Sequence, residues 1–179
     1  MKVFDRFDEW LNEKNNVVYD YGCVMAYFNE PNWQNILAEI NDEDLYTEEN
    51  DNSYGKENEC HCTILYGLHK DVDEEKLLNV ISKFTKPQAT SNKISCFNNE
   101  KYDVLKFDVV SDDLGKMNEE LKQFPFTSNF PDYHAHITIA YLKPGLGEKY
   151  MKNLDSTMNL DFNKIVYSKG NGEKFYYNI

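Results

Sequence analysis

Arginine is nearly absent from this chain of 179 residues, in which Arg6 is the only one. Long apolar runs are absent too: the longest, from Cys23 to Phe28, is far shorter than the roughly 20 residues of a membrane-spanning helix. No CxxC pair occurs among the four cysteines, Cys23, Cys60, Cys62 and Cys96, so neither a zinc ribbon nor a disulfide scaffold is indicated. The first residues are charged and lack the apolar segment of a secretory signal. Together these absences predict a soluble, cytoplasmic protein.

Positive charge is scarce, with 19 basic residues against 31 acidic ones and a formal net charge of −12. This balance excludes a protein that coats nucleic acid through bulk charge, and it disfavours binding to an anionic membrane. Residues 1–60 hold 15 acids and 4 bases, so nearly all of the excess lies there. Residues 41–59, which we call the acidic segment, contain eight acids and one lysine. We expect a long surface loop there, either solvated or in contact with another protein.

Apolar residues make up 41% of the chain and aromatic residues 15%, enough for the packed core of a single domain spanning residues 1–179. Hydrophobic periodicity predicts helices over 3–14, 31–40, 73–84 and 111–122. Residues rich in β-branched and aromatic side chains predict strands over 17–28, 60–66, 94–97, 102–110, 134–141, 162–167 and 174–177. Because helices alternate with strands and hairpins, the fold class is α+β, with a mixed or antiparallel sheet covered by helices.

One six-residue pattern occurs twice. His61-Cys62-Thr63-Ile64-Leu65-Tyr66 and, 75 residues later, His136-Ile137-Thr138-Ile139-Ala140-Tyr141 both read His-x-Thr-Ile-x-Tyr. Both copies fall on predicted strands. Regular alternation would put the histidine and threonine of each copy on one face, and the isoleucine and tyrosine on the other.

Two such strands lying side by side would bring two imidazoles and two hydroxyls together, a set that suits an anionic phosphodiester. A neutral imidazole removes a proton from an attacking hydroxyl, and an imidazolium protonates the leaving oxygen. The threonine hydroxyls donate to the non-bridging oxygens. A thiolate–imidazole metal site, formed by Cys60-His61-Cys62 with His134 and His136, is the weaker interpretation. Alternation turns both cysteines away from His61, so one strand cannot aim all three at one ion.

The paired motifs resemble those of the two-histidine phosphoesterase superfamily, which includes 2′,5′-RNA-ligase-like proteins and cyclic phosphodiesterases. This resemblance implies a bilobal fold with pseudo-twofold symmetry and one His-x-Thr strand per lobe. It also implies catalysis without a metal or other cofactor. Carried over residue by residue, it makes His61, Thr63, His136 and Thr138 the catalytic residues.

The continuation Leu65-Tyr66-Gly67-Leu68, the small size and the amino-acid usage resemble the phage anti-CBASS phosphodiesterases. Those enzymes cleave the cyclic oligonucleotide messengers of bacterial antiphage signalling, which implies action in the host cytoplasm. The resemblance implies a 3′,5′-linked cyclic oligonucleotide as substrate, with no long nucleic acid and no membrane as partner. Either histidine can be the base.

Side chains near the motifs are candidates for holding the nucleotide. Aromatic rings offer stacking surfaces, a histidine two residues before the second motif lies at the rim, and an acid near the C-terminus can reach a base edge. These candidates are Tyr21, Tyr133, His134, Glu173 and Tyr177. Positive charge for the phosphate is expected from Lys70, Lys143 and Lys149.

Three other functions remain open. One is a 2′,3′-cyclic phosphodiesterase or ligase-like enzyme acting on RNA ends. Another is a sponge that binds cyclic nucleotides without cleaving them. In the third, the acidic segment binds a host protein and the motifs are incidental.

Overall fold

The computed structural model describes residues 21–130, 132–154 and 157–178, which form one seven-stranded sheet and four α helices. The strands are β1 (Gly22–Asn29), β2 (His61–Leu68), β3 (Ala89–Asn98), β4 (Asp103–Val110), β5 (His136–Leu142), β6 (Met158–Ser168) and β7 (Lys174–Asn178). The helices are α2 (Trp33–Ala38), α3 (Glu74–Ile81), α4 (Asp112–Leu121) and α5 (Gly147–Asn153), with a short 3-10 helix η1 (Asp42–Asp44).

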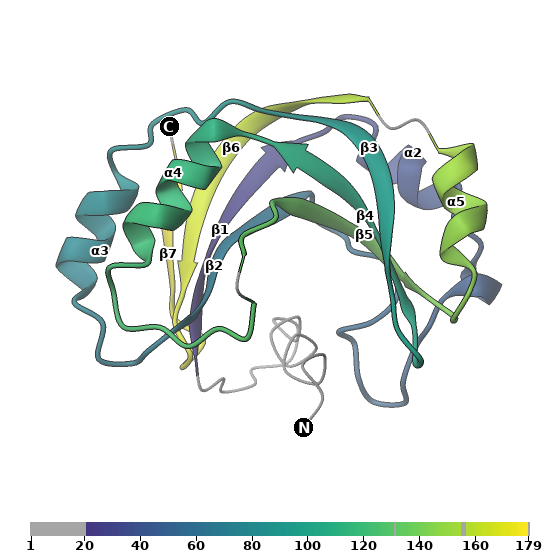
Figure 1. Ribbon diagram of the computed structural model, residues 1–179, viewed down its shortest axis with the longest axis horizontal. Helices are drawn as coiled ribbons and strands as arrows, with labels where there is room; N and C mark the ends of the chain where they lie inside the picture. Colours follow the sequence, from purple (N-terminus) through teal and green to yellow (C-terminus); the bar gives the residue numbers. More distant parts are fainter. Residues whose placement is uncertain (1–20, 131, 155–156, 179) are drawn as a thin grey trace.

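The predicted α+β class is confirmed, and each strand pairing in the described residues is antiparallel. The sheet bends into an arch with the helices outside it, α3 and α4 on one side and α2 and α5 on the other (Figure 1). The predicted helix over 3–14 and the start of the strand over 17–28 lie outside the described residues. Helix α5 was not expected from the sequence.

Polar side chains cap the N-termini of two helices. The Asp73 side chain accepts from the Lys76 amide at the start of α3, and the Ser111 side chain accepts from the Leu114 amide at the start of α4. Such bonds satisfy amides that the first helical turn leaves without partners. They fix where each helix begins.

The sheet consists of two halves joined by one long strand. Its order is β2-β1-β6-β3-β4-β5, with β7 paired to β6. Residues 161–168 of β6 pair with β1, whereas residues 158–160 pair with β3. The two motif strands, β2 and β5, are the ends of this order, yet they contact each other because the sheet arches. The expected bilobal arrangement, with one motif in each half, is therefore present.

Each face of the sheet carries its own apolar cluster. The larger cluster lies between the sheet and the helices and includes Ile64, Leu77, Leu114 and Ile139. The opposite face, which we call the inner face, carries a smaller cluster rich in tyrosine: Cys23, Met25, Tyr27, Tyr54, Tyr102, Val104, Tyr141 and Val166. The helix-side cluster holds the fold together by apolar burial, and the inner face is left for polar groups beside the tyrosines.

The acidic segment lies along the free edge of β5. Main-chain hydrogen bonds join Tyr46 and Gly55 to Tyr141 at 3.0 and 2.8 Å, and Glu57 to Ile139 at 2.9 Å. Its acids bind lysines of the later chain: Asp44 pairs with Lys149 at 2.7 Å, and Glu48 pairs with Lys101. The expected loop is confirmed, but part of its charge is neutralised within the molecule.

Candidate active site

Strands β2 and β5 are held together at the start of the second motif. The Cys62 thiol lies 3.7 Å from the Tyr133 hydroxyl, and the backbone of His136 also hydrogen-bonds this thiol. Burial raises the pKa of Cys62 to about 11, so the sulfur stays protonated at neutral pH and packs as a small apolar group. These contacts bring the two motifs together from sequence positions 75 residues apart.

Both motifs contain a β-bulge at the same place. Between β1 and β2, Val24 pairs with Leu65 and Met25 with Thr63, which leaves Ile64 as the extra residue. Between β4 and β5, Leu105 pairs with Ala140 and Lys106 with Thr138, which leaves Ile139 as the extra residue. Both isoleucines are buried in the helix-side cluster.

The bulges overturn one expectation. Strict alternation predicts Tyr66 and Tyr141 on the face opposite the histidines, but one extra residue in a strand reverses every later side chain. Both tyrosines therefore pack with the cluster on the inner face, together with His61 and His136. The isoleucines face the helices, as predicted.

The two histidine rings are held in the same way. Nδ1 of His61 lies 3.2 Å from the carbonyl oxygen of Glu59, and Nδ1 of His136 lies 2.8 Å from that of His134. A carbonyl oxygen only accepts, so each Nδ1 carries the hydrogen and donates it. This leaves Nε2 of each neutral ring as the atom that can take or deliver a proton.

The surroundings of the two rings differ. His61 stacks on Tyr27 with centroids 5.3 Å apart, and the Lys164 ammonium lies 5.0 Å from the centre of the same Tyr27 ring. His136 meets the Phe97 ring edge to face at 5.5 Å. The two threonines share the strand face of their histidines, with Thr63 half-buried and Thr138 buried.

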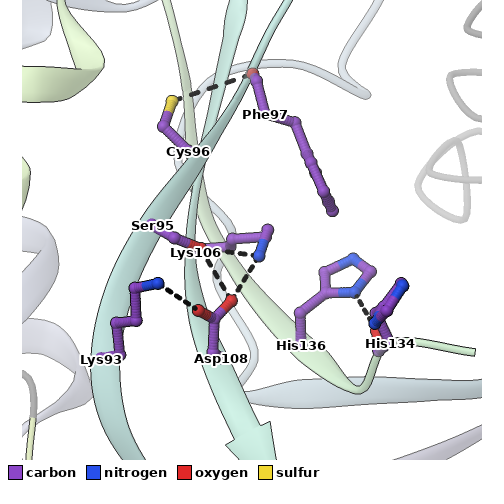
Figure 2. A network of polar contacts seen from close by, with 8 residues as sticks. All are labelled: Lys93, Ser95, Cys96, Phe97, Lys106, Asp108, His134 and His136. Carbon is purple, nitrogen blue, oxygen red and sulfur yellow. Dashed lines mark hydrogen bonds and ion pairs between the residues drawn. The ribbon is translucent and has the colours of Figure 1, made fainter.

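A polar network lies beside His136 (Figure 2). Lys106 donates to Ser95 at 2.7 Å and to Asp108, and Ser95 donates to Asp108 at 2.7 Å. Lys93 lies 3.9 Å from the same carboxylate. Burial raises the pKa of Asp108, but hydrogen bonds from Lys106 and Ser95 outweigh it, and the net pKa is below its ordinary value. Asp108 is therefore ionised at neutral pH.

His136 is uncharged at neutral pH in this arrangement. Loss of hydration lowers its pKa to about 4, and the charges of Lys106 and His61 act in the same direction. The hydrogen bond to His134 and the charge of Asp108 oppose the shift without cancelling it. The strands that carry the two histidines, β2 and β5, contact each other.

An open pocket of about 590 Å³ adjoins this network. Its lining includes Lys93, Ser95, Phe97, Lys106, Asp108 and His134. The volume lies within the range of small-molecule sites. The lining combines charged groups, a hydroxyl and an exposed aromatic ring.

The structure distributes the predicted nucleotide-binding residues unevenly. His134 is exposed and lines the pocket. Tyr133 also lines it, but its hydroxyl faces Cys62, and burial raises its pKa. Tyr21 packs against Tyr66 and His69 at the far end of β2.

The two C-terminal candidates lie elsewhere. Glu173 is exposed in the turn between β6 and β7 and pairs with Lys169 at 2.9 Å. Tyr177 packs against the helix-side cluster, opposite the motifs. Its neighbour Tyr176 is exposed, pairs with the inner-face residue Val166 and contacts Lys164. Because Tyr176 and Tyr177 are adjacent in a strand, their side chains lie on opposite faces of the sheet.

Two of the lysines expected near the phosphate serve the acidic segment instead. Lys143 donates to the Glu43 carbonyl at 2.6 Å, and Lys149 pairs with Asp44. The sequence prediction missed Lys106, which stands in β4 between the apolar residues Leu105 and Phe107. A lysine inside an apolar strand was the signal that could have identified it.

Within the ranges described above, no group of three or more histidine, cysteine, aspartate or glutamate side chains is arranged to hold a metal ion. Cys60 and Cys62 belong to the helix-side cluster, whereas His61 faces the inner side. In the same described ranges, no helix is both long and apolar enough to cross a membrane.

The arched antiparallel sheet with paired His-x-Thr strands is that of a two-histidine phosphoesterase. Two structures of Usb1 from Kluyveromyces marxianus, the second with uridine monophosphate, share the fold with TM-scores of 0.53 and 0.55 at 9% identity. The matches cover 89% and 90% of this chain and 98% and 99% of those chains. No curated protein sequence matches the chain.

The chain belongs to the family described as anti-CBASS protein Acb1, whose model matches residues 26–169. The match includes both motifs and the strands between them. Family membership identifies the chain as a phosphodiesterase directed at cyclic oligonucleotides.

Proposed function

We propose that the protein cleaves 3′,5′-linked cyclic oligonucleotides without a metal ion, using His61 and His136 for proton transfer and Thr63 and Thr138 for binding the phosphate. The observation that supports this proposal best is the meeting of two equivalent strands, each with its histidine held through Nδ1 by a carbonyl two residues earlier. Two imidazoles that are each oriented through Nδ1, with Nε2 as the atom that exchanges the proton, suit proton transfer on both sides of one phosphorus.

The reaction begins at the ribose 2′-hydroxyl next to the scissile phosphate. One neutral histidine takes the hydroxyl proton through Nε2 as the oxygen attacks phosphorus, and the other protonates the departing 5′-oxygen. The opened chain carries a 2′,3′-cyclic phosphate, or its hydrolysed form, and a 5′-hydroxyl. Threonine hydroxyls donate to the non-bridging oxygens, where negative charge increases in the transition state.

The decisive experiment incubates the purified protein in EDTA with a panel of cyclic di- and trinucleotides and an RNA ending in a 2′,3′-cyclic phosphate. Chromatography follows the products. We expect turnover of at least one cyclic oligonucleotide, unchanged by EDTA and lost in H61A and in H136A. H69Q, which alters a histidine outside both motifs, serves as the control and should retain turnover.

Other outcomes identify the alternatives. Turnover abolished by EDTA contradicts metal independence. Turnover confined to the RNA end makes the protein an RNA-end phosphodiesterase, and tight binding without products makes it a sponge. The rate should also pass through a maximum with pH, because one imidazole must be neutral and the other protonated.

A further inference from the structure

The two halves of the site differ at two equivalent positions. In the first half, Met25 pairs with Thr63 and Tyr27 with His61. In the second half, Lys106 pairs with Thr138 and Asp108 with His136. The matching bulges make these positions correspond residue for residue. An apolar and an aromatic side chain in one half thus stand where a lysine and an aspartate stand in the other.

Lys106 is locked in place beside the second motif. Its side chain is only 7% exposed, and its ammonium donates to Ser95 and Asp108. The ammonium also lies 4.3 Å from the centre of the Phe97 ring, whose other neighbour is His136. Because these three groups hold the Lys106 ammonium, its charge has a fixed position, as electrostatic preorganisation requires.

The network has an excess of positive charge. Lys93 and Lys106 face the single carboxylate of Asp108, so one positive charge is left uncompensated within it. That charge lies next to the site of an anionic phosphodiester in a protein whose net charge is −12. Two of the three lysines expected in this role, Lys143 and Lys149, are bound to the acidic segment.

We propose that Lys106 makes the two motif histidines unequal: it keeps His136 as the proton acceptor, with His61 as the proton donor, and offsets the charge of the scissile phosphate. This inference rests on the proposed phosphodiesterase function. Lys106 acts through His136 and through its field, so it is a positioning residue.

The charges around each ring support this division. His136 faces Lys106, Asp108 and His61, and its depressed pKa keeps it neutral and able to accept a proton. His61 faces His136 and stacks on Tyr27, whose ring Lys164 also contacts. The face of an aromatic ring attracts a cation such as an imidazolium. Lys106 thus disfavours the charged form of His136, whereas the ring contact of His61 is the face of Tyr27, which it shares with Lys164.

The proton balance is simple. His136 Nε2 takes the proton of the 2′-hydroxyl, the O2′–P bond forms, and the P–O5′ bond breaks. The Nε2–H of protonated His61 passes its proton to O5′. After release of the product, His136 loses its proton to water and His61 regains one, so no further reactant is needed.

The first test replaces Lys106 by the residue at the equivalent position of the other half. K106M should lower kcat on a cyclic oligonucleotide by roughly 10- to 100-fold at pH 7. It should also move the acid limb of the kcat/KM profile about half a pH unit or more upward, because a positive charge beside His136 is lost. K152M, which removes an exposed lysine of helix α5 outside the network and the pocket, should leave that limb in place.

A half-buried aspartate that has lost its lysine can destabilise the protein, so K106M/D108N is tested in parallel and each variant's melting temperature is recorded. Histidine NMR titration of the ligand-free protein gives a readout that needs no activity. The His136 pKa should be higher in K106M than in the wild type. An unchanged His136 titration together with an unchanged rate would overturn the role of Lys106.

The second test separates the two histidines. A cyclic dinucleotide with sulfur in place of one 5′-bridging oxygen has a leaving group that needs no proton. H61A should therefore cleave this linkage far faster than the oxygen linkage, whereas H136A should cleave neither. Rescue of H136A instead of H61A would reverse the assignment. If the wild type cleaves neither linkage, the proposed function itself fails.

Discussion

Each motif histidine has one nitrogen committed to a main-chain carbonyl, and this leaves the environment to determine how readily the other nitrogen binds a proton. Around His136 that environment disfavours the charged ring. This arrangement lowers the free energy of unfolding at acidic pH, because the unfolded chain binds a proton at His136 more readily than the folded protein does.

The lowered pKa of His136 predicts a pH-dependent loss of stability. The folded pKa of His136, about 4, lies below the ordinary histidine value of 6.5, so the folded protein is destabilised as pH falls from 6.5 toward 4. Between pH 7 and pH 5 the wild type should lose about 1–2 kcal/mol more stability than H136N. Urea unfolding at the two pH values measures the difference. Equal losses in both proteins would contradict the assigned cause.

The threonines give a second prediction for single residues. Thr138→Val keeps the shape of the side chain and removes the hydroxyl, so kcat should fall by about 10- to 100-fold while the fold is kept. Thr63→Val should behave alike. Thr90→Val, at an exposed position on β3, is the matched control. Rates within twofold of wild type in both motif variants would rule out their contact with the phosphate.

At the scale of elements, the strand β2 continues beyond the motif through Gly67, where the sequence predicted that it would stop. Gly67 has a φ of 97°, and a Cβ there would lie 1.9 Å from the Thr127 carbonyl oxygen. The Thr127 amide donates to the Gly67 carbonyl at 2.9 Å. This close approach ties the segment that leads into the second motif to the strand that carries the first.

Gly67→Ala should therefore destabilise the protein by at least about 2 kcal/mol, because the new methyl group meets backbone and the backbone angle is unfavourable. Gly115→Ala is the control: it lies within helix α4, where a Cβ would meet nothing within 4 Å, and alanine favours helices. Thermal unfolding of both variants measures the contrast. A G67A protein as stable as G115A would contradict the close contact.

Much of this arrangement could be predicted from sequence because it depends on local patterns. The paired His-x-Thr strands and the Ser111 cap are determined by residues that are neighbours in the sequence. The sequence pattern does not indicate the two β-bulges. The extra residue in each bulge reverses the face on which Tyr66 and Tyr141 lie, but the motif itself is the same with or without a bulge. Lys106 was missed because its position beside the second motif depends on which strands become neighbours, which one sequence does not state.

At the scale of the whole molecule, the charge is divided between chain segments that fold together. Acids of the acidic segment form ion pairs with Lys101 and Lys149 from the later chain, and Lys143 donates to the main-chain carbonyl of Glu43. The net charge of −12 therefore opposes the binding of an anionic substrate less strongly than the magnitude of this charge suggests. Local pairing, and a lysine network on the inner face, determine the field at the site.

Two variants one residue apart test whether this pairing stabilises the fold. E48Q loses the ion pair with Lys101 and a carboxylate partner of the Tyr46 hydroxyl, so its melting temperature should fall by about 1–3 °C. E49Q makes the same change of charge at an exposed neighbour and should melt like the wild type. Equal melting of both variants would show that only total charge matters.

The joining strand β6 has a consequence for how the protein is made. Both motifs precede it in the chain, and among the strands of the described residues it is the one that pairs with both halves of the sheet, through β1 and β3. During synthesis the two histidines therefore leave the ribosome before the strand that unites their halves. The growing chain therefore contains every proposed catalytic side chain before it contains the strand that joins the two halves of the sheet.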